Sequence, residues 1–198
     1  MKTHVRQPLL IIVFAVFFLL SLLLLFYFTQ VVNEKKVFQG SIFQSQIGSK
    51  VSPNLPVRLI IPVIGVNAKI QYVGVTPEGT MAVPSNATDV GWFKLGPRPG
   101  EKGSAVIAGH LDKENGEAGV FINLYKLKKG DKLYTEDGRG TSITFVVQES
   151  RTYDPGYAND VFSGTGSAHL NLITCDGVWD GTKKSYSKRL VVFADIAH

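Results

Sequence analysis

The chain has only one cysteine, Cys175, among its 198 residues, so no disulfide can form within it. It also has no run of Lys or Arg longer than a pair, and no internal repeat is visible. The formal net charge of +5 falls to +3 once the two positive charges of Lys2 and Arg6 are set aside. This small surplus does not indicate a nucleic-acid-binding protein, and the absence of basic runs argues against a polybasic membrane patch.

One long apolar run lies near the start of the chain. Residues 9–28 read LLIIVFAVFFLLSLLLLFYF, without a charge and with Ser21 as the one polar interruption. As a helix this run spans roughly 30 Å, the thickness of the hydrocarbon core of a bilayer. It is longer than the apolar region of a signal peptide, and no small-x-small cleavage site follows it. The run predicts an uncleaved N-terminal transmembrane helix.

The flanking segments suggest how such an anchor is oriented. Residues 1–8 form a short tail, which is expected to stay in the cytoplasm while the longer C-terminal part is translocated. Residues 29–54 are polar and irregular, which is typical of an extracellular stalk. Residues 55–198 remain as one extracellular domain, large enough for a core of its own. The expected protein is a single-pass protein of the cell membrane.

From Leu55 onward, short β-prone runs alternate with Gly, Pro, Asn and Asp, which is typical of a mainly β sandwich or barrel. Helical stretches are expected only at Val120–Leu127 and Gly156–Phe162. The Asp-Gly pair in Glu136–Gly140 predicts a hairpin turn, and Asp176–Lys188 is expected to be a long functional loop. The predicted strands, mostly antiparallel, are Val57–Ile61, Ala68–Val73, Met81–Val83, Ser104–Gly109, Lys132–Thr135, Thr141–Glu149, Leu170–Thr174 and Leu190–Ala194.

Cys175 ends one of these strands, where a thiol is accessible to a substrate. A nucleophilic cysteine also needs a proton-transfer partner and a group that stabilises an oxyanion. His4 lies on the other side of the predicted membrane span, and His198 is the last residue. His169 shares a strand with Cys175 but lies six residues away, or roughly 20 Å. This leaves His110, which ends an apolar strand, as the candidate acid and base.

Arg189 is the candidate oxyanion stabiliser. It follows Cys175 by fourteen residues, and antiparallel pairing of the two strands brings it level with the thiol. Its guanidinium offers several donors in a fixed geometry and stays charged. Thr174 points to the opposite face in a regular strand, but a bulge there brings its hydroxyl into the site. Trp179, in the predicted loop, is a second candidate substrate contact.

Each of these signals also has a simpler explanation. A lone cysteine in a β domain is most often a small buried hydrophobic residue, and an arginine that begins a strand is usually a solvated charge. Asp112, two residues after His110, either orients the imidazole or only shapes a turn. A non-catalytic, membrane-anchored β-barrel binding module therefore remains an alternative, and thiol labelling of the folded domain distinguishes it from an enzyme.

Other enzymes that use Cys and His are a further alternative. An L,D-transpeptidase of cell-wall peptides requires a Ser-x-Gly-Cys run, whereas Cys175 follows Ile-Thr. A papain-like protease has its cysteine before its histidine, and here His110 comes first. Neither pattern fits this chain.

The candidate residues lie in segments that resemble the sortase family. NLITC at Asn171–Cys175 resembles the TLxTC motif, with Asn in place of its first threonine. AGH at Ala108–His110 resembles the histidine segment, and KRLVVFA at Lys188–Ala194 resembles the arginine strand. The resemblance covers nearly all of Leu55–His198. Within it, Val90–Asp112 is most similar to class F and less similar to class D or E.

The resemblance implies an eight-stranded β-barrel and a cysteine transpeptidase that needs no cofactor. Cys175 would be the nucleophile, His110 the acid and base, and Arg189 the stabiliser of the substrate carbonyl. The implied reaction cleaves an LPxTG-type sorting signal between Thr and Gly, forms a thioester, and passes the protein to an amine on a lipid II-like cell-wall precursor. The family is bacterial and mostly Gram-positive.

Two features of the family do not carry over. The acidic ligands of its calcium sites match no positions in this sequence, so no metal is expected, and Asp112, Glu114 and Glu117 are interpreted as a solvated loop. The stalk also lacks the Asp-Pro-aromatic motif of the lid that pilus-polymerising members carry, so an uncovered site is expected.

Overall fold

The computed structural model of the chain describes residues 19–27, 54–113, 115–156, 158–164 and 166–197. Contacts divide the chain into two units, Met1–Lys50 and Val51–His198. In the first unit, residues 19–27 are helical, and no helix in the described ranges is long and apolar enough to cross a membrane. The predicted tail (1–8), eleven of the twenty residues of the predicted span (9–28) and all of the predicted stalk (29–54) except residue 54 lie outside these ranges. The tail, the span and the stalk remain predictions.

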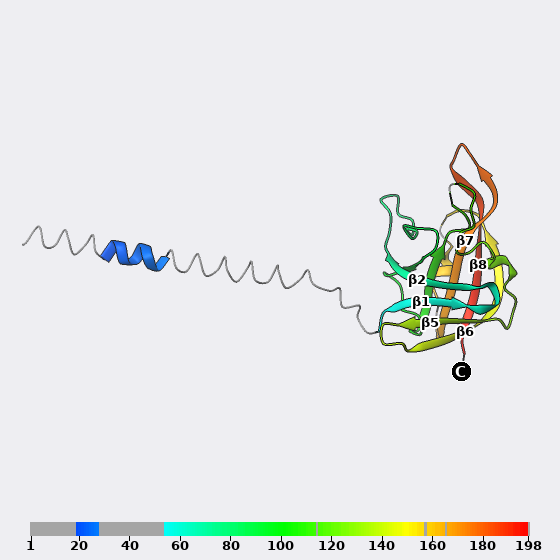
Figure 1. Cartoon of the computed structure of the whole chain (residues 1–198), viewed down its shortest axis with the longest axis horizontal. Helices are drawn as coiled ribbons and strands as arrows, with labels where there is room; N and C mark the ends of the chain where they lie inside the picture. Colours follow the sequence, from blue (N-terminus) through cyan, green and yellow to red (C-terminus); the bar gives the residue numbers. More distant parts are fainter. Residues whose placement is uncertain (1–18, 28–53, 114, 157, 165, 198) are drawn as a thin grey trace, which may run out of the picture. The chain divides into compact units, whose positions relative to one another are not determined.

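The second unit is a closed β-barrel, as expected (Figure 1). In its described part, eight strands follow one another around the barrel in the order β1-β2-β3-β4-β7-β8-β6-β5. The strands are β1 (Pro56–Ile61), β2 (Val66–Val73), β3 (Val90–Phe93), β4 (Gly103–Gly109), β5 (Lys132–Asp137), β6 (Ser142–Tyr153), β7 (Ala168–Asp180) and β8 (Ser185–Ile196). Short helical turns join them at η1 (Pro62–Ile64), η2 (Leu124–Lys126) and α2 (Asn159–Phe162).

Two strand pairs are parallel, β2 with β3 and β4 with β7, while the other pairs are antiparallel. In the second parallel pair, Ala108 of β4 faces Ile173 of β7. Because parallel strands run in one direction, the carboxyl ends of β4 and β7 reach the same end of the barrel. This pairing positions the candidate active site.

Alternating apolar residues fill the barrel, because successive side chains of a strand point to opposite faces. The largest side chains that are fully buried include Leu59, Ile107, Phe121, Phe145 and Leu172. A second cluster joins Val161 of α2 to Val106 of β4 and Val191 of β8. The helix α2 therefore packs against the outer face of the sheet near the centre of β4 and β7.

One predicted strand is wrong and one was missed. At Met81–Val83 the structure has only an isolated bridge, between Val75 and Met81. The missed strand is β3, only four residues long and interrupted by Gly91. That glycine is needed because a Cβ there would lie 2.9 Å from Val73 Cγ1. A short strand with a glycine in it resembles a turn in sequence, which explains the error.

The predicted loop Asp176–Lys188 is also wrong, because most of it is strand. β7 continues to Asp180 and β8 begins at Ser185, so the two strands form a hairpin that projects beyond the barrel (Figure 1, orange and red). Its register shifts between Asp176 and Trp179, where Gly177 has a φ of 80°. This bulge and the polar residues around it disguise the strand pattern.

The predicted hairpin turn and helical stretches agree better with the structure. Asp137 and Gly140 form the expected hairpin turn, in which the Gly140 amide donates to the Asp137 carbonyl at 3.0 Å. The expected helix at Val120–Leu127 is reduced to η2, and the expected turn at Gly156–Phe162 contains α2.

Gly177→Ala is expected to destabilise the domain by about 1–2 kcal/mol, since a non-glycine residue at positive φ is strained. The added Cβ would also lie 2.4 Å from Ser187 Oγ, which accepts a hydrogen bond from the Val178 amide. Urea or thermal unfolding measures the loss. Gly181→Ala is the control, because nothing lies within 4 Å of a Cβ there. Equal stability of the two variants would contradict the role assigned to the bulge.

Candidate active site

The ends of β4 and β7 bring two candidate residues together. Thr174 Oγ1 donates to the Gly109 carbonyl at 2.9 Å, which extends the parallel register of the two strands to their ends. Continued by one more residue, this register sets His110, which directly follows β4, beside Cys175 of β7. Gly109 is required here, because a Cβ would lie 2.5 Å from Cδ2 of the buried Phe121. The fold therefore places the predicted acid and base beside the predicted nucleophile.

Thr174 itself points into the barrel. It is 3% exposed, and its hydroxyl is engaged by the Gly109 carbonyl. The register shift in β7 begins only after Asp176, so it does not turn the Thr174 hydroxyl toward the thiol. In this structure Thr174 joins the two strands that carry His110 and Cys175.

The His110 ring is held by the backbone of the segment between β2 and β3. Its Nε2 lies 2.9 Å from the Pro84 carbonyl oxygen. A carbonyl only accepts hydrogen bonds, so Nε2 carries a proton, and Nδ1 is the nitrogen that can accept one. Sequence reasoning missed this partner, because any residue can supply a backbone carbonyl.

Cys175 is half-buried and pairs directly with Arg189 across β7 and β8, as predicted. Burial raises the pKa of the Cys175 thiol above its ordinary value. The charge of Arg189 opposes this by lowering the pKa, and the charge of Asp112 raises it further. The thiol is therefore mostly protonated at neutral pH and needs a base to become a strong nucleophile.

The Arg189 guanidinium is positioned by the hairpin that carries it. Nη1 donates to the Tyr186 carbonyl at 2.9 Å and to the Lys188 carbonyl at 2.7 Å, and Nη2 donates to Ser185 Oγ at 3.1 Å. These bonds fix the plane of the guanidinium. The Nε–H group and the second N–H of Nη2 remain free to donate to a substrate oxygen. Arg189 is the cross-strand partner of Cys175, and its charge favours the thiolate by lowering the pKa of the thiol.

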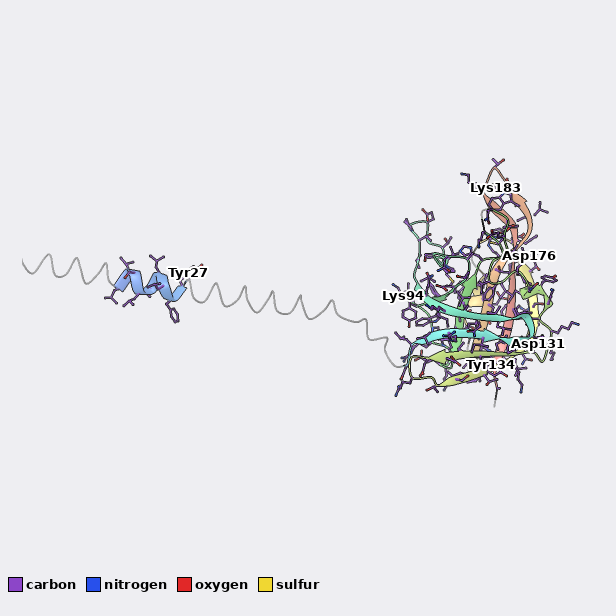
Figure 2. The ribbon with its side chains drawn as sticks, in the orientation of Figure 1. Tyr27, Lys94, Asp131, Tyr134, Asp176 and Lys183 are labelled. Atoms are coloured by element: carbon purple, nitrogen blue, oxygen red, sulfur yellow. The ribbon has the colours of Figure 1, made fainter. Side chains whose placement is uncertain are left out.

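The β7–β8 hairpin also reaches across to the segment after His110. Figure 2 shows Asp176 near the end of the barrel and Lys183 at the tip of the hairpin. On the hairpin, the rings of Trp179 and Tyr186 pack edge to face with their centroids 5.2 Å apart. The Tyr186 hydroxyl donates to Asp112 Oδ2, which raises the pKa of Tyr186 to about 12. The hairpin therefore forms one wall of the site, and Trp179 is 52% exposed on it.

Asp112 is thus placed differently from the sequence-based alternatives. In the described residues its carboxylate is bonded to Tyr186, while the His110 ring is bonded to Pro84. Asp112 neither orients the imidazole nor acts only within a turn. Sequence reasoning could not find the Tyr186 contact, because the two residues are 74 positions apart.

His169 belongs to the other end of β7. Its Nδ1 lies 2.7 Å from Asp195 Oδ1, and its Nε2 lies 3.2 Å from Ser167 Oγ. Both ring nitrogens are engaged there, and the residue is six positions from Cys175 on a regular strand. It therefore has no part in the chemistry of the thiol.

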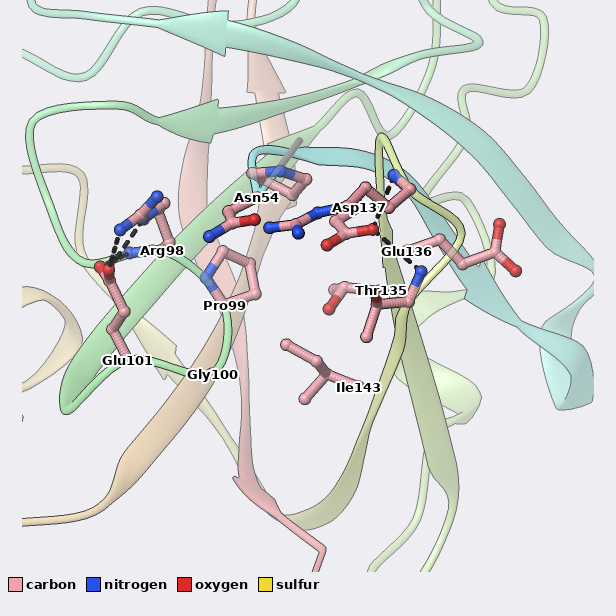
Figure 3. A pocket seen from close by; sticks show the side chains of 12 residues that line it. Asn54, Arg98, Pro99, Gly100, Glu101, Thr135, Glu136, Asp137 and Ile143 are labelled. Atoms are coloured by element: carbon pink, nitrogen blue, oxygen red, sulfur yellow. Dashed lines mark hydrogen bonds and ion pairs between the residues drawn. The ribbon is translucent and has the colours of Figure 1, made fainter. Parts of the chain in front are cut away.

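A cavity of about 440 Å³ also lies at the end of the barrel away from Cys175 (Figure 3). Its walls include the start of β1, the β3–β4 connection and the β5–β6 hairpin. The side chain of Arg98 is paired with Glu101, and Asp137 accepts hydrogen bonds from the backbone of its own turn. No three His, Cys, Asp or Glu side chains in the described ranges form a group that could hold a metal ion.

The raised pKa of Cys175 predicts how its alkylation depends on pH. With iodoacetamide, the rate should rise with a midpoint above that of an unperturbed cysteine, because burial disfavours the thiolate. Arg189→Gln should move the midpoint up, and Asp112→Asn should move it down. Mass spectrometry of the full-length protein follows the reaction. A midpoint below that of a free cysteine would contradict this electrostatic description, and a thiol inert at every pH would support the binding module.

Comparisons with known proteins agree with this architecture. The family model described as Sortase domain matches residues 59–197. A curated relative, Sortase A of Listeria monocytogenes serovar 1/2a, is 35% identical over 83 residues, which are 42% of this chain and 36% of the relative. The alignment thus spans only about a third of that relative.

Solved sortase structures share the fold. Sortase C-1 from Actinomyces oris matches with a TM-score of 0.59 and 25% identity, over 79% of this chain and 81% of that one. The pilus-related Sortase C of Group B Streptococcus matches with a TM-score of 0.57 and 24% identity, over 75% of this chain and 70% of that one. Residues 37–53, where a lid would lie, are outside the described ranges, so the expectation of an uncovered site remains a prediction.

Proposed function

The chain belongs to the sortase family, and on that premise we propose that it is a membrane-anchored cysteine transpeptidase of LPxTG-type sorting signals. One observation carries the proposal. The parallel β4–β7 register pairs Ala108 with Ile173, and continued by two residues it sets His110 beside Cys175, while the β7–β8 register pairs Cys175 with Arg189. These positions support Cys175 as the nucleophile, His110 as the base and Arg189 as the cationic donor.

In the proposed first step, the Cys175 sulfur attacks the carbonyl carbon of the Thr–Gly bond, and His110 Nδ1 takes the thiol proton. Arg189 stabilises the negative charge that develops on the carbonyl oxygen. The C–N bond then breaks, and His110 returns the proton to the departing glycine nitrogen. The product is a thioester between the threonine carbonyl and Cys175.

In the second step an amine attacks the thioester carbon and the C–S bond breaks, which restores the thiol. We propose a lipid II-like cell-wall precursor as the source of the amine. The raised pKa of the free thiol supports base-assisted attack, because little thiolate is present before the base acts. Trp179 is a proposed substrate contact on the exposed hairpin, and Thr174 a proposed positioning residue.

Three finer assignments belong to the same proposal. The likeness of Val90–Asp112 to class F supports that class over D or E. The apolar run at 9–28 supports a single-pass anchor with the barrel outside the cell, where proteins with sorting signals and the precursor are found. The small formal net charge gives no support for a nucleic-acid partner.

The test is to mix the full-length protein, in detergent micelles, with an LPxTG-type peptide and glycine amide. The expected product is the peptide cut after threonine and joined to glycine amide, detected by its mass. An enzyme that cleaves another bond gives a different mass. Peptide binding without any cleavage would refute the proposal and favour the binding module.

A further inference from the structure

We propose that Asp112, held by the Tyr186 hydroxyl, is the docking group for the protonated amine of the acceptor substrate. This inference rests on the proposed function and adds to it a site for one of the two substrates. The acceptor is accordingly a primary amine that is cationic when it arrives.

The position of Asp112 is fixed by contacts from two segments of the chain. It lies two residues after His110 and forms a bridge with Ala118, which anchors its backbone. From the other side, Tyr186 of β8 donates its hydroxyl proton to Oδ2. Tyr186 is in turn backed by Trp179, with ring centroids 5.2 Å apart. The carboxylate is therefore held between the strand of the base and the hairpin of Arg189.

Asp112 lies on the side of the site that faces the thiol's strand partner. It is bonded to Tyr186, three residues before Arg189, which pairs with Cys175. Its charge also contributes to the raised pKa of the Cys175 thiol. An amine that attacks the thioester must come within about 3–3.5 Å of the carbonyl carbon. A cation bound at Asp112 would thus be held near the bond that it has to attack.

The cationic side chains nearest to Asp112 and Cys175 in the strand register have partners of their own. Lys113 pairs with Glu117, and Lys188 pairs with Asp154 at 2.6 Å. The Arg189 guanidinium is bonded to the hairpin, as described above. No ion pair of Asp112 occurs among the described side chains.

Asp112 is therefore a half-buried carboxylate beside the nucleophile without a cationic side chain of its own. The Tyr186 hydroxyl bonds to Oδ2, and no described hydrogen bond engages Oδ1. An ammonium group is the complement of that oxygen in charge and in hydrogen bonding.

The chemistry balances with His110 as the proton carrier. The docked ammonium gives one proton to solvent, and the neutral nitrogen attacks the thioester carbon. A C–N bond forms while the C–S bond breaks, and the second proton passes through His110 to the departing Cys175 sulfur. Asp112 binds and orients the amine, and does not form a bond with it.

The experiment compares a cationic acceptor with a neutral one. At pH 7 glycine amide is mostly protonated, as α-amino groups are, whereas hydroxylamine is mostly uncharged. In Asp112→Asn, the KM for glycine amide should rise about three- to tenfold, the loss of a surface or partly buried ion pair. The KM for hydroxylamine should stay unchanged. The lowered pKa of the Cys175 thiol in this variant acts on thioester formation, which is common to both acceptors, so only the difference between the two acceptors reports docking. Tyr186→Phe should shift the KM for glycine amide in the same direction by a smaller factor.

Glu136→Gln is the control, because it removes one negative charge at the opposite end of the barrel, in the wall of the cavity described above. It should leave both KM values unchanged. Salt gives a second measurement: added salt should raise the KM for glycine amide in the wild type and much less in Asp112→Asn. Equal changes for both acceptors in Asp112→Asn would overturn the inference while leaving the proposed function intact. A wild type that forms no thioester would overturn both.

Discussion

Arg189→Lys is expected to lower kcat by about 10²–10³, the usual cost of losing one well-placed oxyanion donor. Lysine keeps the charge but lacks the planar fork. In this structure the fork is held by the Tyr186 and Lys188 carbonyls and by Ser185 Oγ, which direct its remaining donors. A lysine ammonium cannot make these bonds and also present a donor in the same place.

The measurement is kcat and KM for cleavage of a sorting-signal peptide by the wild type, Arg189→Lys and Arg189→Ala. KM should change less than kcat, because the interaction strengthens as charge develops on the carbonyl oxygen. Arg98→Lys, at the opposite end of the barrel, is the control, and melting curves show whether each variant folds. Near-normal turnover in Arg189→Lys would mean that charge alone suffices. Near-normal turnover in Arg189→Ala would mean that Arg189 does not stabilise the oxyanion, and the backbone amides flanking Cys175 would be the next candidates.

Cys175→Ala should abolish both peptide cleavage and thioester formation, because Cys175 is the one cysteine of the chain and a thioester needs its sulfur. The thiol is half-buried and small, so the variant should melt close to the wild type. Peptide cleavage followed by mass spectrometry, beside a melting curve, tests both parts. Full activity in Cys175→Ala would remove Cys175 from the mechanism and leave a structural thiol.

The positions of Cys175 and Arg189 relative to each other could be predicted from the sequence, because they depend on strand pairing. Cys175 and Arg189 lie on consecutive strands, so antiparallel pairing makes them neighbours even though both strands extend beyond their predicted ends. His110 follows β4 and Cys175 lies on β7, but sequence does not show that these two strands pair in parallel. That step depends on the order of strands around the barrel, in which β4 and β7 are adjacent.

The contacts that hold the candidate site residues in place could not be predicted from the sequence, for three physical reasons. Pro84 holds His110 through its carbonyl, which carries no residue signature. Tyr186 meets Asp112 only because the hairpin that carries it is strand, and its bulge at Gly177 hides the alternation. β3 is short and contains a glycine that packing requires, so its sequence resembles a turn. In each case backbone geometry, and not side-chain pattern, determines the contact.

The central claim is that Cys175 forms a thioester with the threonine of a sorting signal. The most direct measurement mixes the full-length protein with an LPxTG-type peptide without an acceptor amine, quenches it in acid, and maps the adduct by mass spectrometry. We predict a mass increase equal to the peptide up to its threonine, located on the fragment that contains Cys175 and released by hydroxylamine. Peptide cleavage with no adduct on that fragment, or with an adduct on another residue, would contradict the account.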